Sequence, residues 1–264
     1  MADGCGIRME QVSYSIGGRS ILRDFDLSLD PGVNRTILGV SGVGKTTILK
    51  LLLGLLKPDS GRIIIEEEDI ATLSEGGLAL ARNHIAIVFQ GGALFDSMTV
   101  GENVGYRMME EGDLAEQEID AIVREKLGFV GLEKAINLYP AELSGGMKKR
   151  VALARALVTE PEMVLFDEPT TGLDPIRKHA VHSLITDYQR KFGFTAVLVS
   201  HEIPDVFYIS QRIAMIDAGR IEFAGTPEEL QQSANPVVRE FIDAARFEGN
   251  PSGNFNIGAR VEVS

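Results

Sequence analysis

The chain has 264 residues, of which 44% are hydrophobic and 24% are charged, and this length suffices for one large domain or for a domain with an inserted lobe. Its formal net charge of −12 argues against a sequence-independent nucleic-acid binder, because such a protein needs a basic surface to displace counterions from phosphates. The sequence has no apolar run of about 18 residues and no secretory leader, and its single cysteine, Cys5, forms no internal disulfide, so we expect a cytoplasmic chain.

The first third of the chain alternates short apolar strands with turn sequences. The turns are predicted at Gly17-Gly18, at Asp30-Pro31-Gly32 and at residues 58–61, which read PDSG. The predicted strands cover residues 7–14, 25–29, 35–38, 62–65 and 85–89. This region is therefore predicted to be mainly β-sheet.

Residues 39–46 read GVSGVGKT and separate the predicted strand 35–38 from an apolar helix that begins near Ile48. Gly39, four intervening residues and then Gly44-Lys45-Thr46 match the P-loop pattern, in which backbone N–H groups wrap the phosphates of a nucleotide. Glycines let the backbone approach an anion closely, and the following helix points the positive end of its dipole at the phosphates. The strand before, the helix after and the Lys-Thr pair favour phosphate binding over a plain glycine-rich turn.

The P-loop pattern also assigns roles within the segment. Lys45 is expected to reach the β- and γ-phosphates, and the Thr46 hydroxyl is expected to ligate Mg²⁺. The residues expected to contact the triphosphate are Gly39, Ser41, Gly42, Val43, Gly44, Lys45, Thr46 and Thr47. The chain is therefore predicted to bind a nucleoside triphosphate.

From about Gly91 to Glu160 the sequence becomes helical and polar, and this segment contains LSGGMKKR at residues 143–150. Ser144 is a good N-cap, and Gly145-Gly146 leave backbone N–H groups exposed before a predicted helix. A helix cap alone would explain Ser144 but would not require two glycines, so we predict a second anion site. Two chains related by a two-fold axis and arranged head-to-tail could then sandwich two nucleotides.

A strand at residues 163–166 ends in two carboxylates, Asp167 and Glu168. The carboxyl ends of parallel strands are where such sheets place ligands. Asp167 is expected to hold Mg²⁺ through water beside Thr46, and Glu168 to polarise the attacking water as a general base. A strand that simply ends at a charged loop is the alternative, and the P-loop upstream favours the catalytic interpretation.

The last third again alternates strands with helices. A helix is predicted from about Pro175 to Lys191, and a short helical piece from Val237 to Arg246 in an otherwise polar tail. The predicted strands cover residues 195–199, 212–216 and 220–223. This alternation predicts an α/β fold, in which helices cover a parallel sheet and a helical lobe interrupts it.

Four motifs in this order, GVSGVGKT, LSGGM, VLFDE and a lone His201 after the strand TAVLVS, resemble the nucleotide-binding subunit of ABC transporters. The resemblance implies an ATPase domain over residues 1–232: a P-loop NTPase (RecA-like) parallel sheet core, an N-terminal antiparallel β-subdomain and an α-helical subdomain inserted at about 91–160. Residues 233–264 would be a C-terminal extension. The family hydrolyses ATP with Mg²⁺ as a homodimer bound to integral-membrane permease subunits.

The family also implies further roles. Gln90, after the strand 85–89, is similar to the Q-loop glutamine that senses Mg²⁺ and water and couples to the membrane subunit. His201 is similar to the switch histidine that contacts the γ-phosphate, although a lone histidine at a strand end more often has no catalytic role. The Mg²⁺ ligands would be Thr46, Gln90 and Asp167. The residues that would contact the nucleotide of the partner chain are Ser144, Gly145, Gly146 and Asp174.

Two positions depart from the usual pattern of the family. The signature usually ends in glutamine, and here the residue is Met147, which lies past the phosphate-binding glycines. The aromatic residue that stacks on adenine should fall at Ile16, with Tyr14 nearby. The sequence therefore predicts that aliphatic packing by Ile16 holds the base.

The longer stretches LSGGMKKR, FQGGALFDSMTVGENVGY and VSHEIPDVF are most similar to the ATPases of Mla/Mce-type lipid transporters. This resemblance implies phospholipid transport between bacterial envelope membranes, with a permease, an MCE substrate-binding protein and often a STAS-domain partner. It places the chain on the cytoplasmic face of the inner membrane. The stretch PVVREFIDAARFEG is similar to an extension that contacts the neighbouring protomer.

Three alternatives stay open at the level of sequence. One is a transporter ATPase for another small solute, and a second is a division-type ABC regulator. The third is a soluble ABC ATPase that acts on nucleic acid or ribosomes, against which the acidic balance and the absence of tandem domains argue. No residue of the chain identifies the cargo, because the ATPase does not touch it.

Overall fold

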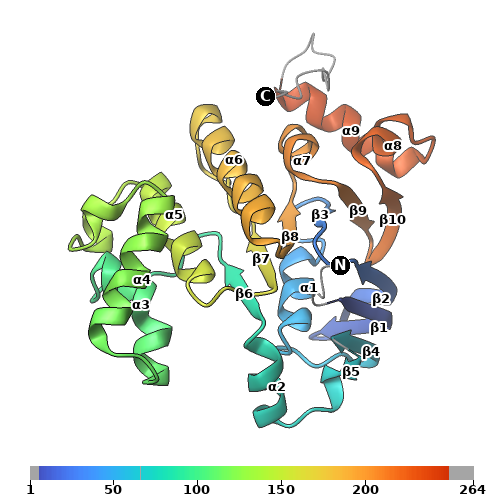
Figure 1. Cartoon of the computed structure of the whole chain (residues 1–264). Helices are drawn as coiled ribbons and strands as arrows, with labels where there is room; N and C mark the ends of the chain where they lie inside the picture. The colour runs from blue at the N-terminus through green and yellow to red at the C-terminus, as the bar shows by residue number, and fades with distance from the viewer. Residues whose placement is uncertain (1–5, 66, 250–264) are drawn as a thin grey trace.

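The computed structural model describes residues 6–65 and 67–249, and Figure 1 shows its two sheets and a separate lobe of helices. The first sheet is four-stranded, with the order β2-β1-β4-β5, and all its pairs are antiparallel. Its strands are β1 (Ile7–Ile16), β2 (Arg19–Leu29), β4 (Ser60–Ile65) and β5 (Glu68–Asp69). Gly17 and Gly18 form the turn between β1 and β2 with φ of 57° and 80°, the left-handed region that glycine tolerates. The predicted strand at 25–29 thus begins earlier, at Arg19.

The second sheet has six strands in the order β10-β9-β3-β8-β7-β6. Its strands are β3 (Asn34–Leu38), β6 (Ile85–Val88), β7 (Met163–Asp167), β8 (Thr195–Ser200), β9 (Arg212–Asp217) and β10 (Arg220–Gly225). All neighbours are parallel except β9 and β10. Every residue of β7 is buried, as expected for a parallel strand covered on both faces. The predicted α/β class is confirmed.

Helix α1 (Lys45–Leu52) lies in the core between the two sheets. Its residues Ile48, Leu49, Leu51 and Leu52 are fully buried, and they pack in one apolar cluster with residues of β1, β2 and β3. A helix that is apolar on this much of its surface is expected in a core. The helix that follows the P-loop is thereby fixed relative to the parallel sheet.

The helical lobe contains α3 (Val100–Glu111), α4 (Glu116–Phe129) and α5 (Gly145–Leu157), which lie within the segment predicted at 91–160. Thr99 caps α3 in a capping box with Glu102, and Gly112 ends it at φ 73°. Helix α6 (Pro175–Phe192) follows β7 and packs against α5. The lobe and the parallel sheet share one apolar core cluster, which includes Val104, Val151 and Phe166.

Helices α2 (Glu75–Arg82) and α7 (Ile203–Ile209) were not expected from the sequence. Helix α2 begins with two glycines after Glu75, which weakens its helical signal, but the Ser74 hydroxyl caps it by accepting the Gly77 N–H at 3.3 Å. Among residues 6–65 and 67–249, no helix combines the length and apolar character that crossing a bilayer requires.

The C-terminal segment differs from the polar tail that the sequence predicts. Helices α8 (Pro227–Gln232) and α9 (Pro236–Gly249) cover the β9–β10 edge of the sheet, as Figure 1 shows. Val238 and Ile242 of α9 are 0% and 1% exposed, in a cluster with Leu38 and Met215. Only one face of α9 is apolar, so the segment looks polar in the sequence and still packs as a core helix. Cys5 and the tail after residue 249 lie outside the described residues.

This packing predicts that Ile242→Ala will lower the free energy of unfolding by about 2–5 kcal/mol, because it leaves a cavity under α9. Glu240→Ala on the exposed side of the same helix is the matched control and should change it by less than about 0.5 kcal/mol. Urea titration followed by circular dichroism measures both. Equal midpoints for the two variants would mean that α9 contributes nothing to the core.

Candidate functional site

The phosphate loop connects the carboxyl end of β3 to the first turn of α1. Gly44 is the N-cap of α1 at φ 115°, and no side chain caps the helix. A Cβ atom at Gly39 would lie 2.7 Å from the carbonyl oxygen of Ile216, and one at Gly44 would lie 2.8 Å from Cγ2 of Ile21. Both positions therefore require glycine, and the uncapped N–H groups of α1 are left for an anion.

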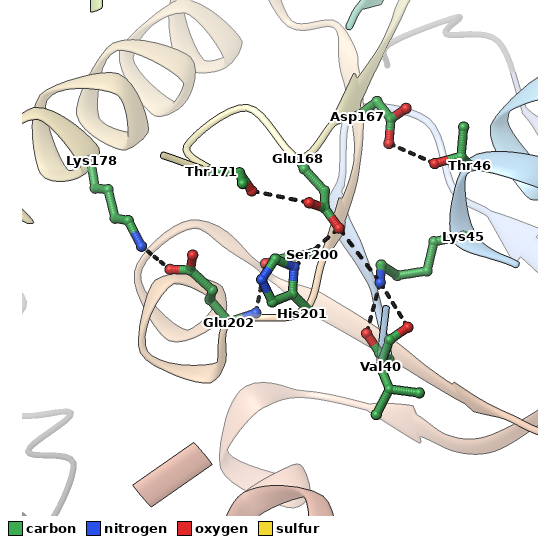
Figure 2. A network of polar contacts seen from close by, with 11 residues as sticks. Val40, Lys45, Thr46, Asp167, Glu168, Thr171, Lys178, Ser200, His201 and Glu202 are labelled. Carbon is green, nitrogen blue, oxygen red and sulfur yellow. Dashed lines mark hydrogen bonds and ion pairs between the residues drawn. The ribbon is translucent and has the colours of Figure 1, made fainter. Parts of the chain in front are cut away.

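Lys45 points back over this loop. It is only 5% exposed, and its Nζ donates to the carbonyl oxygens of Gly39 at 2.8 Å and Val40 at 3.1 Å. The same Nζ lies 3.6 Å from Oε1 of Glu168. Burial lowers the pKa of Lys45, and the charge and hydrogen bond of Glu168 oppose this effect. A cation thus lies between the loop and the carboxylate of Glu168, as Figure 2 shows.

Thr46 and Asp167 meet at the start of α1. The Thr46 hydroxyl donates to Oδ1 of Asp167 at 3.0 Å. Burial raises the pKa of Asp167, and the hydrogen bond from Thr46 partly offsets this effect. A hydroxyl and a carboxylate are hard oxygen ligands, and a protein often binds Mg²⁺ with one or two such groups while substrate phosphates and water supply the rest. The two side chains that the sequence pairs for Mg²⁺ fit that ion.

Glu168 is the centre of the polar network in Figure 2. Its Oε1 lies 3.0 Å from Nδ1 of His201, and its Oε2 accepts the Thr171 hydroxyl at 3.0 Å. Burial raises the pKa of Glu168, but the hydrogen bond and charge of His201, the Thr171 hydroxyl and the Lys45 charge together bring it below its usual value. Glu168 is therefore an anion at neutral pH, as a general base must be.

The backbone at Glu168 is strained. Its φ is 47°, which a non-glycine residue adopts at a cost on the order of 1–3 kcal/mol, and its N–H donates to the carbonyl oxygen of Val199 at 3.2 Å. Such strain persists only where the surroundings hold it, and it is concentrated at functional sites. The three side-chain contacts and the bond to β8 hold this carboxylate in one place.

The other predicted residues lie apart from this cluster. Gln90 is exposed and follows β6, whose neighbour in the sheet is β7, so it lies at the same edge as Asp167. Ser144, Gly145 and Gly146 begin α5, where the Ser144 hydroxyl accepts the Met147 N–H at 3.3 Å. In Figure 1 this helix belongs to the lobe and lies away from α1. Within one chain, the structure does not bring the signature residues to the P-loop.

Asp174 caps α6 by accepting the Arg177 N–H at 3.0 Å, and it is exposed. Met147 packs partly buried against the core cluster of the helical lobe. The exposed cap and the glycine pair, of which Gly145 is exposed and Gly146 half-buried, are surfaces that a second protomer could complete, which is the role that the sequence predicts for them.

A pocket of about 550 Å³ lies on the outer side of the P-loop. Its walls are Arg19, Ser20, Ile21 and Arg23 of β2, residues 40–43 of the P-loop, and residues 217–219 between β9 and β10. Ile16 does not line this pocket, although it pairs with Arg19 across the hairpin and is 53% exposed. Tyr14 packs on the core cluster between the two sheets. Among the described residues, therefore, no aromatic side chain lines the pocket.

The sequence did not predict a role at this site for two kinds of residue. Thr171 lies three residues after Glu168, a spacing at which a turn can return a hydroxyl to the carboxylate, and this spacing could have been noticed. Arg19 and Arg23 carried no such signal, because only the tertiary structure places β2 beside the P-loop.

The chain matches the family model described as ABC transporter over residues 22–171. It is 39% identical over 237 residues to the intermembrane phospholipid transport system ATP-binding protein MlaF of Escherichia coli K12, covering 90% of this chain and 88% of that protein. It is also 40% identical over 236 residues to the methionine import ATP-binding protein MetN of Xanthomonas axonopodis pv. citri, covering 88% of this chain and 70% of that protein.

The fold is similar to a dimeric, post-hydrolysis structure of the ATP-binding cassette MJ0796 bound to ADP and Pi. The TM-score is 0.76 at 30% sequence identity, and the match covers 84% of this chain and 98% of that one. Both the sequence and the fold therefore point to one family.

The raised pKa of Asp167 predicts a stability effect that depends on pH. The folded chain binds this proton more tightly than the unfolded chain does, so stability falls as the pH rises through the two pKa values. Asp167→Asn is expected to raise the melting temperature of the nucleotide-free protein at about pH 8 and to raise it less at about pH 4. Asn can still accept the Thr46 hydrogen bond.

Differential scanning fluorimetry at the two pH values measures this effect. Asp113→Asn, which removes an exposed carboxylate, is the control and should leave the melting temperature unchanged. A gain for Asp167→Asn of the same size at both pH values would contradict the assignment of an ionised, desolvated carboxylate.

Proposed function

The chain belongs to the ATP-binding proteins of ABC transporters and hydrolyses ATP, and from this premise we propose that it energises phospholipid transport between the membranes of a bacterial envelope. The observation that carries the cargo assignment is the similarity to MlaF along 90% of the chain, together with the variant signature LSGGM that ends in Met147. The comparable identity to MetN makes amino-acid import the second candidate.

In the proposed mechanism, the P-loop and Lys45 bind the triphosphate of ATP. Lys45 would exchange the carbonyl oxygens of Gly39 and Val40 for phosphate oxygens, which are stronger partners for an ammonium group. The base and ribose would extend toward the pocket lined by Ile21 and Arg19. Mg²⁺, held by Thr46 and Asp167 with Gln90 nearby, would supply charge neutralisation for the phosphates.

Hydrolysis would need a second protomer. Ser144, Gly145 and Asp174 are exposed and Gly146 is half-buried, the helix α5 lies away from α1 of its own chain in Figure 1, and the related cassette MJ0796 is a dimer. In a two-fold, head-to-tail dimer, each α5 would point its N–H groups at the γ-phosphate bound by the partner. The positive ends of α1 and α5 would then stabilise the charge of the transition state.

Glu168 is proposed as the general base. An attacking water would transfer a proton to its carboxylate while the water oxygen bonds to the γ-phosphorus and the bond to ADP breaks. His201 would hold the carboxylate through Nδ1 and present its other ring nitrogen to the γ-phosphate. The products are ADP and inorganic phosphate, and their mutual repulsion would open the dimer.

This opening is the movement that would be transmitted to permease subunits in the inner membrane, from its cytoplasmic face. Gln90, which follows β6 at the edge of the sheet next to the helical lobe, would report the state of the nucleotide to such a partner. An MCE substrate-binding protein and a STAS-domain protein complete the proposed complex. The extension 233–264 is proposed as a contact to the neighbouring protomer, through the faces of α9 that do not pack on the sheet.

Glu168→Gln should reduce the turnover number for ATP by about 10²-fold or more, because the amide cannot accept the proton. ATP binding should persist, and the variant should elute as a dimer in ATP because the products that separate the protomers are not formed. Phosphate release and size-exclusion chromatography measure the two effects. The exposed Glu125→Gln is the control, and a Glu168→Gln enzyme with the wild-type rate would remove Glu168 from its role.

Purification of the tagged chain from detergent-solubilised membranes tests the cargo. We expect a permease, an MCE protein and phospholipid to co-purify, and reconstituted complexes to move fluorescent phospholipid between vesicles only when ATP is hydrolysed. The same complexes carrying Glu168→Gln are the control. Co-purification with an amino-acid-binding protein, without bound lipid, would favour the second candidate instead.

A further inference from the structure

Lys149 of the signature helix reaches the loop that carries the catalytic carboxylate. It lies in the second turn of α5, after the glycine pair at Gly145 and Gly146, and it is half-buried. Its Nζ donates to the carbonyl oxygen of Thr171 at 2.7 Å. A residue of the helical lobe is thus bonded to the turn that follows β7.

Thr171 in turn holds Glu168 at two points. Its hydroxyl donates to Oε2 of Glu168 at 3.0 Å, and its backbone N–H donates to the carbonyl oxygen of Glu168 at 3.3 Å. The turn that these bonds close contains the strained backbone of Glu168, with φ of 47°. A continuous chain of hydrogen bonds therefore runs from α5 through Thr171 to the carboxylate of the general base.

The Lys149 ammonium group is partly desolvated and lies among charged side chains. Burial and the neighbouring Lys178 lower the pKa of Lys149, and the charges of Glu168 and Glu202 offset only part of this effect. Glu202, which follows His201 in the sequence, forms an ion pair with Lys178. Lys149 of the signature helix therefore lies close to Glu168, the proposed base, and to Glu202, which follows the switch histidine.

The adjacent Lys148 shows that this placement is specific. Lys148 carries the same charge on the same helix and is also half-buried. Within residues 6–65 and 67–249, however, no hydrogen bond or ion pair involves its ammonium group. A solvated lysine on the signature helix would resemble Lys148, and Lys149 does not.

We propose that Lys149 is a positioning residue for ATP hydrolysis, which couples the position of the signature helix to the orientation of Glu168. The proposal rests on the proposed function, since it requires Glu168 to be the base and α5 to close on the partner's nucleotide. The start of α5 would contact the nucleotide bound by the partner. Lys149, one turn further on, would orient Glu168 for hydrolysis of the nucleotide bound by its own chain. Closure of the dimer and activation of water would thereby be linked through one side chain.

The test compares Lys149→Met with Lys148→Met in the full-length protein. Each removes one ammonium group from the same helix and keeps a long apolar stem, and methionine is a good helix former. We expect Lys149→Met to lower kcat for ATP about ten-fold or more and to leave KM within about two-fold, because the lost contact orients the base and does not bind ATP. Lys148→Met should keep both constants near those of the wild type. Lys149→Arg, which can still donate to a carbonyl group, should recover part of kcat.

A double variant tests whether Lys149 acts through Thr171. Thr171→Val removes the hydroxyl that holds Glu168 and leaves the carbonyl group in place, so this single change should lower kcat. Lys149→Met combined with Thr171→Val should then be little worse than the more damaging single change. If Lys149→Met does not fold, Thr171→Val and Lys149→Arg carry the test.

Any of four results would overturn the proposal. They are equal kcat values for Lys149→Met and Lys148→Met, a rise in KM at constant kcat for Lys149→Met, multiplicative effects of Lys149→Met and Thr171→Val on kcat, and a wild-type kcat for Thr171→Val. Failure of the proposed mechanism would look different, because Glu168→Gln would then hydrolyse ATP at the wild-type rate.

Discussion

The parallel pairing of β3, β8 and β7 is the constraint on which the rest of the site depends. In register, Leu38 lies opposite Ser200, and Asp167 lies opposite Val199. The strands therefore end at one edge, and the segments that follow them bring the P-loop, the two carboxylates and His201 together although they are far apart in sequence. The strands are buried on both faces, so a one-residue slip in register would move each side chain into a space packed for another, and this packing penalty keeps the site assembled.

The environment shifts the pKa values of two adjacent carboxylates, Asp167 and Glu168, in opposite directions. Burial raises the pKa of Asp167 by more than the Thr46 hydrogen bond and the Lys45 charge lower it, whereas His201, Thr171 and Lys45 bring that of Glu168 below its usual value. A desolvated Asp167 would favour the binding of Mg²⁺, because the metal charge would compensate for the lost hydration of the carboxylate. Glu168 is already ionised and held in a strained backbone position, which suits a base that must meet a water molecule in one orientation. The desolvated carboxylate of Asp167 and the strained backbone of Glu168 both lower the stability of the fold, as is common where a site serves a function.

The helical lobe leaves its own signature residues facing outward. The N-terminus of α5, with an exposed Gly145 and a half-buried Gly146, lies away from α1 of its own chain, so the proposed anion site there would be completed by another protomer. The bond from Lys149 to Thr171 links this outward-facing helix to the turn that follows Glu168. In the proposed mechanism, one rigid helix would therefore contact the nucleotide of the partner and orient the base of its own chain.

The sequence by itself determined the P-loop, the two carboxylates after β7, the α/β class and the family. These features depend on local spacing, since a phosphate loop needs its glycines and lysine within eight residues, and a parallel strand needs a continuous apolar run. The tertiary structure alone decided the contacts between distant segments: the hydrogen bond of Lys149 to Thr171, the placement of Arg19 beside the P-loop and the burial of α9. Helix α9 has one apolar face, and whether that face is a core or a surface depends on the β9–β10 edge it meets, which no local pattern in the chain encodes.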